Sequence, residues 1–170
     1  LKPSDYPFQV HGTDGFGDAL SCNININCPE GNNWQAHKRG VMRVLRVFEE
    51  GTGWCTGTLI NNTAEDGTPY ILSAYHCYAG LTPELDLWRF DFNYESPDCN
   101  NPASNPIAQA MLGCSLVSGR EQSDFLLLKL DQRVPSQLNP LYIGWNRDST
   151  LLPASSVGIH HPQGDIKKIS

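Results

Sequence analysis

A histidine directly after a predicted strand is the first residue of this 170-residue chain whose position could support chemistry. Residues 70–74 are rich in strand-forming side chains, and His76 and Cys77 follow them almost at once. A general base must be held firmly against its partner, and a strand end tied by a disulfide holds an imidazole better than a free loop does. The alternative is a structural histidine, since this residue type is often partly buried for packing alone.

A second candidate is Asp124, which stands at the start of the strongly apolar stretch 125–130. A carboxylate beside such a strand is expected to be partly buried, and it then needs a dedicated hydrogen-bond donor. The imidazole of His76 is the natural donor. The alternative is an ordinary turn aspartate at the beginning of the strand.

The elements that would position these two residues are short strands. Residues 88–94 alternate apolar and polar side chains, which is typical of a half-buried strand. Further β-forming runs bounded by Gly, Pro, Asn or Asp lie at 41–48, 54–60, 70–74, 125–130, 141–145 and 156–160. No long amphipathic helix interrupts them, so we expect an all-β, antiparallel Greek-key barrel over about residues 40–130. Its core is expected to include Leu59, Leu72, Phe90, Phe92 and Leu127.

The composition of the chain argues against nucleic acids and membranes as binding partners. Lys plus Arg number 12 and Asp plus Glu 18, so the net charge is -6, and no basic cluster is present to bind nucleic acid or an anionic membrane. No apolar run approaches the length of a membrane span, and no leader peptide opens the chain. We therefore expect neither a nucleic-acid nor a membrane partner.

Six cysteines favour an oxidised, secreted protein over a cytosolic one. The competing interpretation is a zinc site, but the cysteines lack the close pairs that zinc sites use. The adjacent His160 and His161 raise a second metal hypothesis, which is weak because neighbouring residues of a strand point to opposite faces. We expect no cofactor and no metal.

Three sequence motifs identify a resemblance to a known family. The segments at 55–60 (CTGTLI), 73–77 (SAYHC) and 123–128 (SDFLLL) resemble chymotrypsin-like serine peptidases in type, order and spacing. The segments at 22–31, 61–63, 88–99 and 158–162 are more narrowly similar to bacterial lysyl endopeptidases, and the resemblance covers residues 21–170. It implies a trypsin-like β-barrel followed by the start of a second barrel.

The resemblance also implies roles for individual residues. His76 corresponds to the catalytic base, and Asp124 to the residue that fixes its tautomer. The family pattern pairs Cys55 with Cys77 and Cys28 with Cys99. Cys22 would pair with a cysteine of the second barrel in that pattern, or with Cys114 if the partner lies within this chain.

The chain departs from the family at one decisive point. No Gly-x-Ser-Gly turn follows Asp124, so the nucleophilic serine and the specificity pocket are expected beyond residue 170. We therefore divide the chain into a linker or propeptide remnant at 1–20, an N-terminal barrel with its extended leading segment at 21–135, and an interbarrel connection with the first strands of the second barrel at 136–170.

The function expected from these features is peptide-bond hydrolysis by a secreted serine endopeptidase, with lysine-directed cleavage as its finer form. Its partners are polypeptide substrates and the remaining part of the second barrel, and this chain alone is expected to be inactive. The alternative is a protease-fold scaffold or binding protein that has lost its nucleophile.

Overall fold

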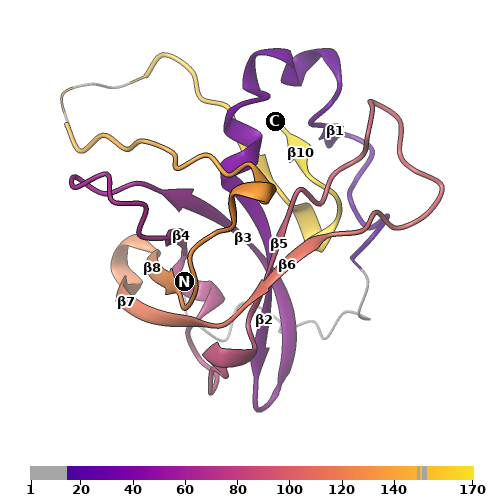
Figure 1. The fold of residues 1–170 in the computed structure, drawn as a ribbon. Helices are drawn as coiled ribbons and strands as arrows, with labels where there is room; N and C mark the ends of the chain where they lie inside the picture. Colours follow the sequence, from indigo (N-terminus) through magenta and orange to yellow (C-terminus); the bar gives the residue numbers. More distant parts are fainter. Residues whose placement is uncertain (1–14, 149, 151–152) are drawn as a thin grey trace.

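The computed structural model describes residues 15–148, 150 and 153–170 of the chain. These residues form two antiparallel sheets joined by loops and short 3-10 turns, as the strand-rich sequence predicts (Figure 1). The larger sheet has the strand order β6-β5-β2-β3-β4-β8-β7, and the smaller one has the order β1-β10-β9. None of the described residues forms a helix that is long and apolar enough to cross a membrane.

The strands and turns have the following bounds. The larger sheet contains β2 (Val41–Phe48), β3 (Gly51–Ile60), β4 (Tyr70–Ala74), β5 (Arg89–Phe92), β6 (Gln109–Leu112), β7 (Cys114–Arg120) and β8 (Phe125–Leu130). The smaller sheet contains β1 (Ile24–Asn25), β9 (Ile159–His160) and β10 (Lys168–Ile169). The 3-10 turns are η2 (Pro29–Trp34), η3 (His37–Gly40), η4 (Tyr75–Cys77), η5 (Leu85–Leu87), η6 (Glu121–Ser123), η7 (Ser136–Leu138) and η8 (Pro162–Gly164).

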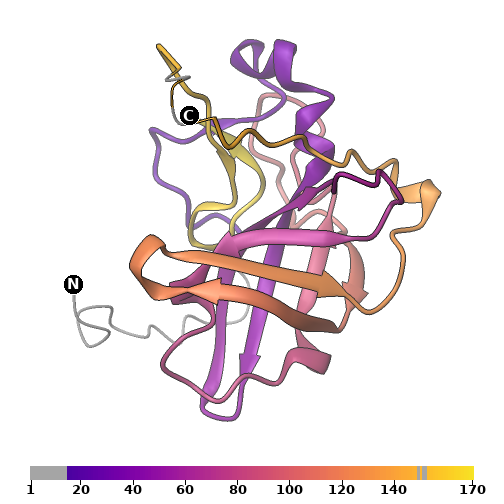
Figure 2. The same ribbon diagram turned by 90° about the vertical axis from the view of Figure 1, so that its left-hand side faces the viewer.

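The larger sheet curls into a half-barrel because its two edge strands are consecutive in the chain. β6 and β7 lie at opposite ends of the strand order, yet Gly113 alone separates them. Gly113 adopts a φ of 84°, in the left-handed region that favours glycine, and thereby bends what would otherwise be one strand. In Figure 2 the orange β7–β8 pair lies across the purple β2–β3 pair, as a curled sheet requires.

The core lies on the inner face of this sheet. Leu59, Phe90 and Phe92 are buried there as expected, together with Trp88, which donates from its indole Nε1 to the carbonyl of Val47 at 2.9 Å. Further core residues are Met42, Val44, Phe48, Ile71, Met111, Leu126, Leu128 and Leu130.

Two core assignments from the sequence are wrong. Leu72 and Leu127 are only half-buried, and the two residues pair with each other on the outer face of β4 and β8. Their neighbours Ile71, Leu126 and Leu128 point inward instead. Alternate residues of a strand face opposite sides, so an error of one position exchanges the two faces.

A buried arginine connects the two sheets. Arg43 of β2 forms an ion pair with Asp91 of β5 at 2.7 Å and donates from Nη1 to the carbonyl of Gly164 at 2.8 Å. Its guanidinium also lies over the rings of Trp54 and Tyr94, at 4.2 and 3.6 Å from their centroids. The planar cation therefore contacts both the barrel and the turn between β9 and β10.

The structure contains two disulfides, Cys28–Cys99 and Cys55–Cys77, the same two pairs that the family pattern implies. The pairing of Cys22 with Cys114 is wrong, because both cysteines are free. Cys22 is exposed in the leading segment, whereas Cys114 is buried at the start of β7. Burial, with the nearby Asp131 and Asp86 adding to it, raises the pKa of the Cys114 thiol to about 12, so this cysteine is a packing residue.

Candidate active site

His76 lies where a central strand of the barrel ends. It belongs to η4, which follows β4 directly, and β4 is hydrogen-bonded to β3 on one side and to β8 on the other. The next residue, Cys77, forms the disulfide with Cys55 of β3. The backbone that carries His76 is thus held by two neighbouring strands and one covalent link, which is the rigid support that a general base needs.

Asp124 lies at the adjacent strand end. It follows η6 and precedes β8, and its φ of 50° and ψ of 33° place it in the left-handed region, which aspartate tolerates better than most residues. Ala74 of β4 pairs with Phe125 of β8. This register brings Asp124 and His76 to the same end of the sheet although they are 48 positions apart.

Three hydrogen bonds join the two segments. The imidazole Nδ1 of His76 lies 2.7 Å from Oδ2 of Asp124, so the imidazole is the hydrogen-bond partner of Asp124 that the sequence suggests. The backbone N–H of His76 donates to Oδ1 of Asp124 at 2.8 Å, and that of Tyr75 donates to the Asp124 carbonyl at 3.0 Å. The carboxylate therefore fixes both the main chain and the ring of the histidine.

These contacts determine the proton positions. Desolvation works against the ionised form of Asp124, but the hydrogen bonds from the backbone and ring of His76 outweigh it and hold the pKa of the carboxyl below its ordinary value. An ionised carboxylate can only accept, so Nδ1 carries the proton of this hydrogen bond, and in the neutral form of the ring the lone pair is then on Nε2. Both side chains are about half exposed, at 52%, so the imidazole lies on an accessible surface.

The same residues offer a geometry that could be mistaken for a metal site. Ligand atoms of Cys55, His76 and Cys77 lie within 4.8 Å of one another. The two sulfurs are joined in the Cys55–Cys77 disulfide and so are not the thiolates that bind zinc. The cluster is better explained as the covalent support of the histidine.

Of the residues singled out in the sequence, the structure brings together His76, Asp124, Cys55 and Cys77. His161 lies elsewhere: it is buried, and its Nδ1 lies 2.9 Å from the backbone carbonyl of Asp165. Burial, with a lesser contribution from Lys167, keeps the pKa of His161 well below its ordinary value. His161 is therefore a neutral packing residue, which directly follows β9 and stacks against the ring of Tyr94.

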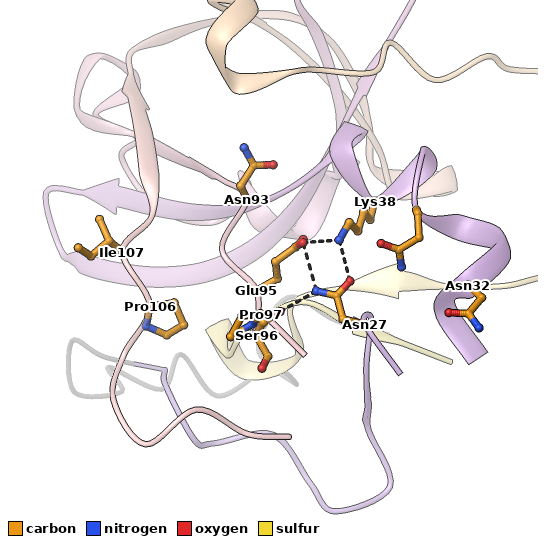
Figure 3. Close-up of a pocket in the computed structure, with 10 residues that line it drawn as sticks. Asn27, Asn32, Lys38, Asn93, Glu95, Ser96, Pro97, Pro106 and Ile107 are labelled. Carbon is orange, nitrogen blue, oxygen red and sulfur yellow. Dashed lines mark hydrogen bonds and ion pairs between the residues drawn. The ribbon is translucent and has the colours of Figure 1, made fainter. Parts of the chain in front are cut away.

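Sequence reasoning missed a polar cavity on another part of the molecule. Its volume is about 750 Å³, and Asn27, Lys38, Asn93 and Glu95 are among its lining residues (Figure 3). The acidic Glu95 and the basic Lys38 are 57 positions apart in the sequence. No short-range pattern could have indicated that they form an ion pair.

Comparison with known proteins finds a matching family and a related protein. The family model described as "Lysyl endopeptidase, C-terminal domain" matches residues 16–170. The protein named lysyl endopeptidase from Pseudomonas aeruginosa is 30% identical over 177 aligned positions, which include 98% of this chain. The chain spans 37% of the length of that relative.

Proposed function

The chain belongs to the lysyl endopeptidase family, since the model of that family's C-terminal domain matches residues 16–170, and we propose that it forms part of a secreted serine endopeptidase. In this proposal His76 is the general base and Asp124 is the residue that orients it. The observation that carries this proposal is the 2.7 Å contact between Nδ1 of His76 and Oδ2 of Asp124 at a supported strand end. The two disulfides support an extracellular, oxidising location.

In the proposed reaction, Nε2 of His76 accepts the proton of a serine hydroxyl while the serine oxygen attacks the carbonyl carbon of a peptide bond. Asp124 stabilises the imidazolium that forms. The imidazolium then gives its proton to the leaving amine as the carbon–nitrogen bond breaks, which leaves an acyl-enzyme. Water, activated by the same histidine, hydrolyses this ester and restores the serine.

We place the nucleophilic serine and the pocket for the substrate side chain outside these 170 residues, since no Gly-x-Ser-Gly turn follows Asp124. The chain alone is then inactive, and the rest of the second barrel is its necessary partner. Lysine-directed cleavage is the finer part of the proposal. It rests on the family match and on the name of the Pseudomonas relative.

The test uses the full-length protein and two variants of the site. His76→Ala and Asp124→Asn should each lower peptide-bond hydrolysis by about 10⁴-fold or more, because each removes the correctly oriented base. His37→Ala is the matched control, since His37 is exposed on η3 and belongs to another part of the fold. Circular dichroism should show unchanged folding in all three variants.

A choice of substrates separates the general proposal, serine endopeptidase activity, from the finer one, cleavage after lysine. Peptides that differ only in having lysine, arginine or leucine before the scissile bond should be cleaved with a preference for lysine. Equal cleavage of all three would leave a serine endopeptidase without lysine specificity. Full activity in a folded His76→Ala variant would refute the assignment of the base, and an inert wild-type protein would favour a protease-fold scaffold.

A further inference from the structure

The lysines of the described chain are unusually well hidden. Lysine is ordinarily among the most exposed residues and is rarely buried unless it is paired. The five lysines of the sequence are Lys2, Lys38, Lys129, Lys167 and Lys168, of which Lys2 lies outside the described residues. Three of the other four direct their ammonium groups into the protein, as the following contacts show.

Lys38 and Lys167 share one carboxylate. Their Nζ atoms lie 2.5 and 3.1 Å from the two carboxylate oxygens of Glu95, and their side chains are 15% and 0% exposed. Figure 3 shows Lys38 turned toward Glu95 and Asn27 at the wall of the polar cavity, and its Nζ donates to Oδ1 of Asn27 at 2.7 Å. Lys167 also donates from Nζ to the backbone carbonyl of Lys38 at 2.8 Å.

That last contact engages the carbonyl group that a protease would attack. Cleavage after a lysine begins at the carbonyl of that lysine, and the Lys38 carbonyl accepts hydrogen bonds from both Lys167 and the backbone N–H of Val41. Glu95 stays ionised in this cluster, because the ammonium groups of Lys167 and Lys38 outweigh the effect of burial and lower the pKa of its carboxyl.

The ammonium group of Lys168 is likewise bound inside the protein, in this case by asparagine side chains. It is 2% exposed, and its Nζ donates to Oδ1 of Asn25 at 2.6 Å and to Oδ1 of Asn101 at 3.2 Å. Its backbone belongs to β10, the middle strand of the small sheet, which pairs with β1 and β9 on its two sides. The peptide bond after Lys168 is thus protected in two ways: the lysine side chain is buried, and the backbone is paired with a strand on each side.

Lys129 has an exposed side chain, but its main chain is protected. It lies in β8 between β4 and β7, where it pairs with Tyr70 on one side and Ser115 on the other. A protease requires a segment that can leave its neighbours and enter a cleft, which is why nicking concentrates at exposed loops. The ladder bonds on both edges of β8 prevent this.

Arginine differs from lysine in the exposed loops. Arg43 is buried and Arg39, Arg46 and Arg89 are half-buried, as most of the described lysines are. Arg133 and Arg147, in contrast, are exposed and stand outside any strand or helix, and Arg147 lies between the exposed Asn146 and Asp148. Among the described residues, the exposed basic side chains in loops are thus arginines and not lysines.

We infer that this arrangement protects the folded protein from digesting itself: the described lysyl bonds are withheld from a lysine-directed active site, and the basic side chains in those exposed loops that the structure describes are arginines. This inference rests on the proposed lysine specificity for its purpose. The shielding itself is independent of that specificity and can be measured separately.

The experiment introduces one exposed lysine into the full-length protein. Arg147→Lys keeps the positive charge and the loop, and Arg147→Gln is the matched control that removes the arginine without adding a lysine. Each protein is incubated alone and also with an added lysine-specific endopeptidase, and mass spectrometry maps new ends within residues 15–170.

With the added endopeptidase, only Arg147→Lys should be cut rapidly, after position 147. The wild type and Arg147→Gln should be cut at least roughly 10³-fold more slowly, since their lysyl bonds become available only on unfolding. Rapid cutting of native wild type after Lys38, Lys129, Lys167 or Lys168 would overturn the inference. Resistance of Arg147→Lys equal to that of the wild type would also overturn it, because lysine placement would then not be the cause.

The incubations without added enzyme test whether the shielding protects the protein from self-digestion. Self-cleavage of Arg147→Lys alone, after position 147, is the expected result. A second outcome is that the added endopeptidase cuts Arg147→Lys but the variant neither cuts itself nor hydrolyses lysyl peptides. The proposed lysine specificity is then wrong, although the shielding of the native lysines is confirmed. If lysyl peptides are hydrolysed but the variant stays intact on its own, the protective role fails and the proposed function stands.

Discussion

Replacing Glu95 by glutamine should destabilise the fold, because this carboxylate is shared by two ammonium groups. Lys167 is wholly buried and Lys38 mostly so, and their Nζ atoms lie 3.1 and 2.5 Å from the Glu95 oxygens. At 3.1 Å and an effective dielectric constant of about 20, one such attraction is worth roughly 5 kcal/mol before desolvation is subtracted. Glutamine keeps the shape but loses the charge, while Lys167 still has to be buried.

The expected loss is about 3 kcal/mol in the free energy of unfolding, at the lower end of the range for breaking a buried ion pair because Lys38 is partly solvated. Urea unfolding of the full-length protein measures it. Glu50→Gln is the control: Glu50 is exposed and accepts hydrogen bonds from Thr82, so its loss should change stability much less than the loss of the Glu95 charge does.

The pH dependence of the free energy of unfolding is a second measure of the interaction between Glu95 and the two lysines. The ammonium groups lower the pKa of Glu95 in the folded state, although burial opposes them, so its contribution is fully present above the unfolded pKa of about 4.3. The contribution is lost as pH falls through the lower folded pKa. The difference between wild type and Glu95→Gln should therefore shrink in acid. A difference below about 1 kcal/mol at pH 7, or one that does not change with pH, would refute this reasoning.

Three further outcomes are expected in urea unfolding. Leu126→Ala should cost about 2 to 5 kcal/mol because Leu126 is fully buried, whereas Leu127→Ala, one position away on the outer face, should cost clearly less; equal losses would contradict the assignment of faces. Removing the disulfide between Cys28 and Cys99 by double alanine substitution should cost about 4 kcal/mol, given its sequence separation of 71, and an unchanged midpoint would contradict this value. Gly164→Ala should be destabilising, since its φ is 78° and an added Cβ would lie against an indole ring; a neutral result would show that this turn can move.

The longer strands could be predicted from the sequence because their residues follow a local pattern. Residues 41–48, 70–74 and 125–130 were predicted as strands and are β2, β4 and β8 in the structure. The two faces of β8 could not be distinguished, since the run from 125 to 128 is apolar at every position and a period of 2 is invisible in it. Only the pairing of β8 with β4 and β7 decides that Leu126 and Leu128 are inside.

The candidate site was more predictable than the contacts around it. His76 and Asp124 each stand at the end of a recognisable strand, and the resemblance to a known family supplied the pairing of those strand ends. The cluster of Glu95 with Lys38 and Lys167 had no such signal, because its members come from segments without periodicity. The two-residue strands β1 and β10 are likewise too short for a sequence pattern. β9 lies in the run 156–160 that was predicted as a strand, but only Ile159 and His160 form one, and its pairing with β10 defines it.

The pairing of β1 with β10 joins the first strand of the described chain to the last, with Ile24 opposite Ile169. Everything that forms the barrel lies inside the loop that this contact closes. Closing so long a loop in a flexible chain costs roughly 4 kcal/mol of entropy, so the contact becomes favourable only after the barrel has brought the two ends together. During synthesis, the ribosome therefore releases residues 24 and 25 long before their partner exists, and the nascent segment must wait unpaired until the chain beyond residue 169 has emerged.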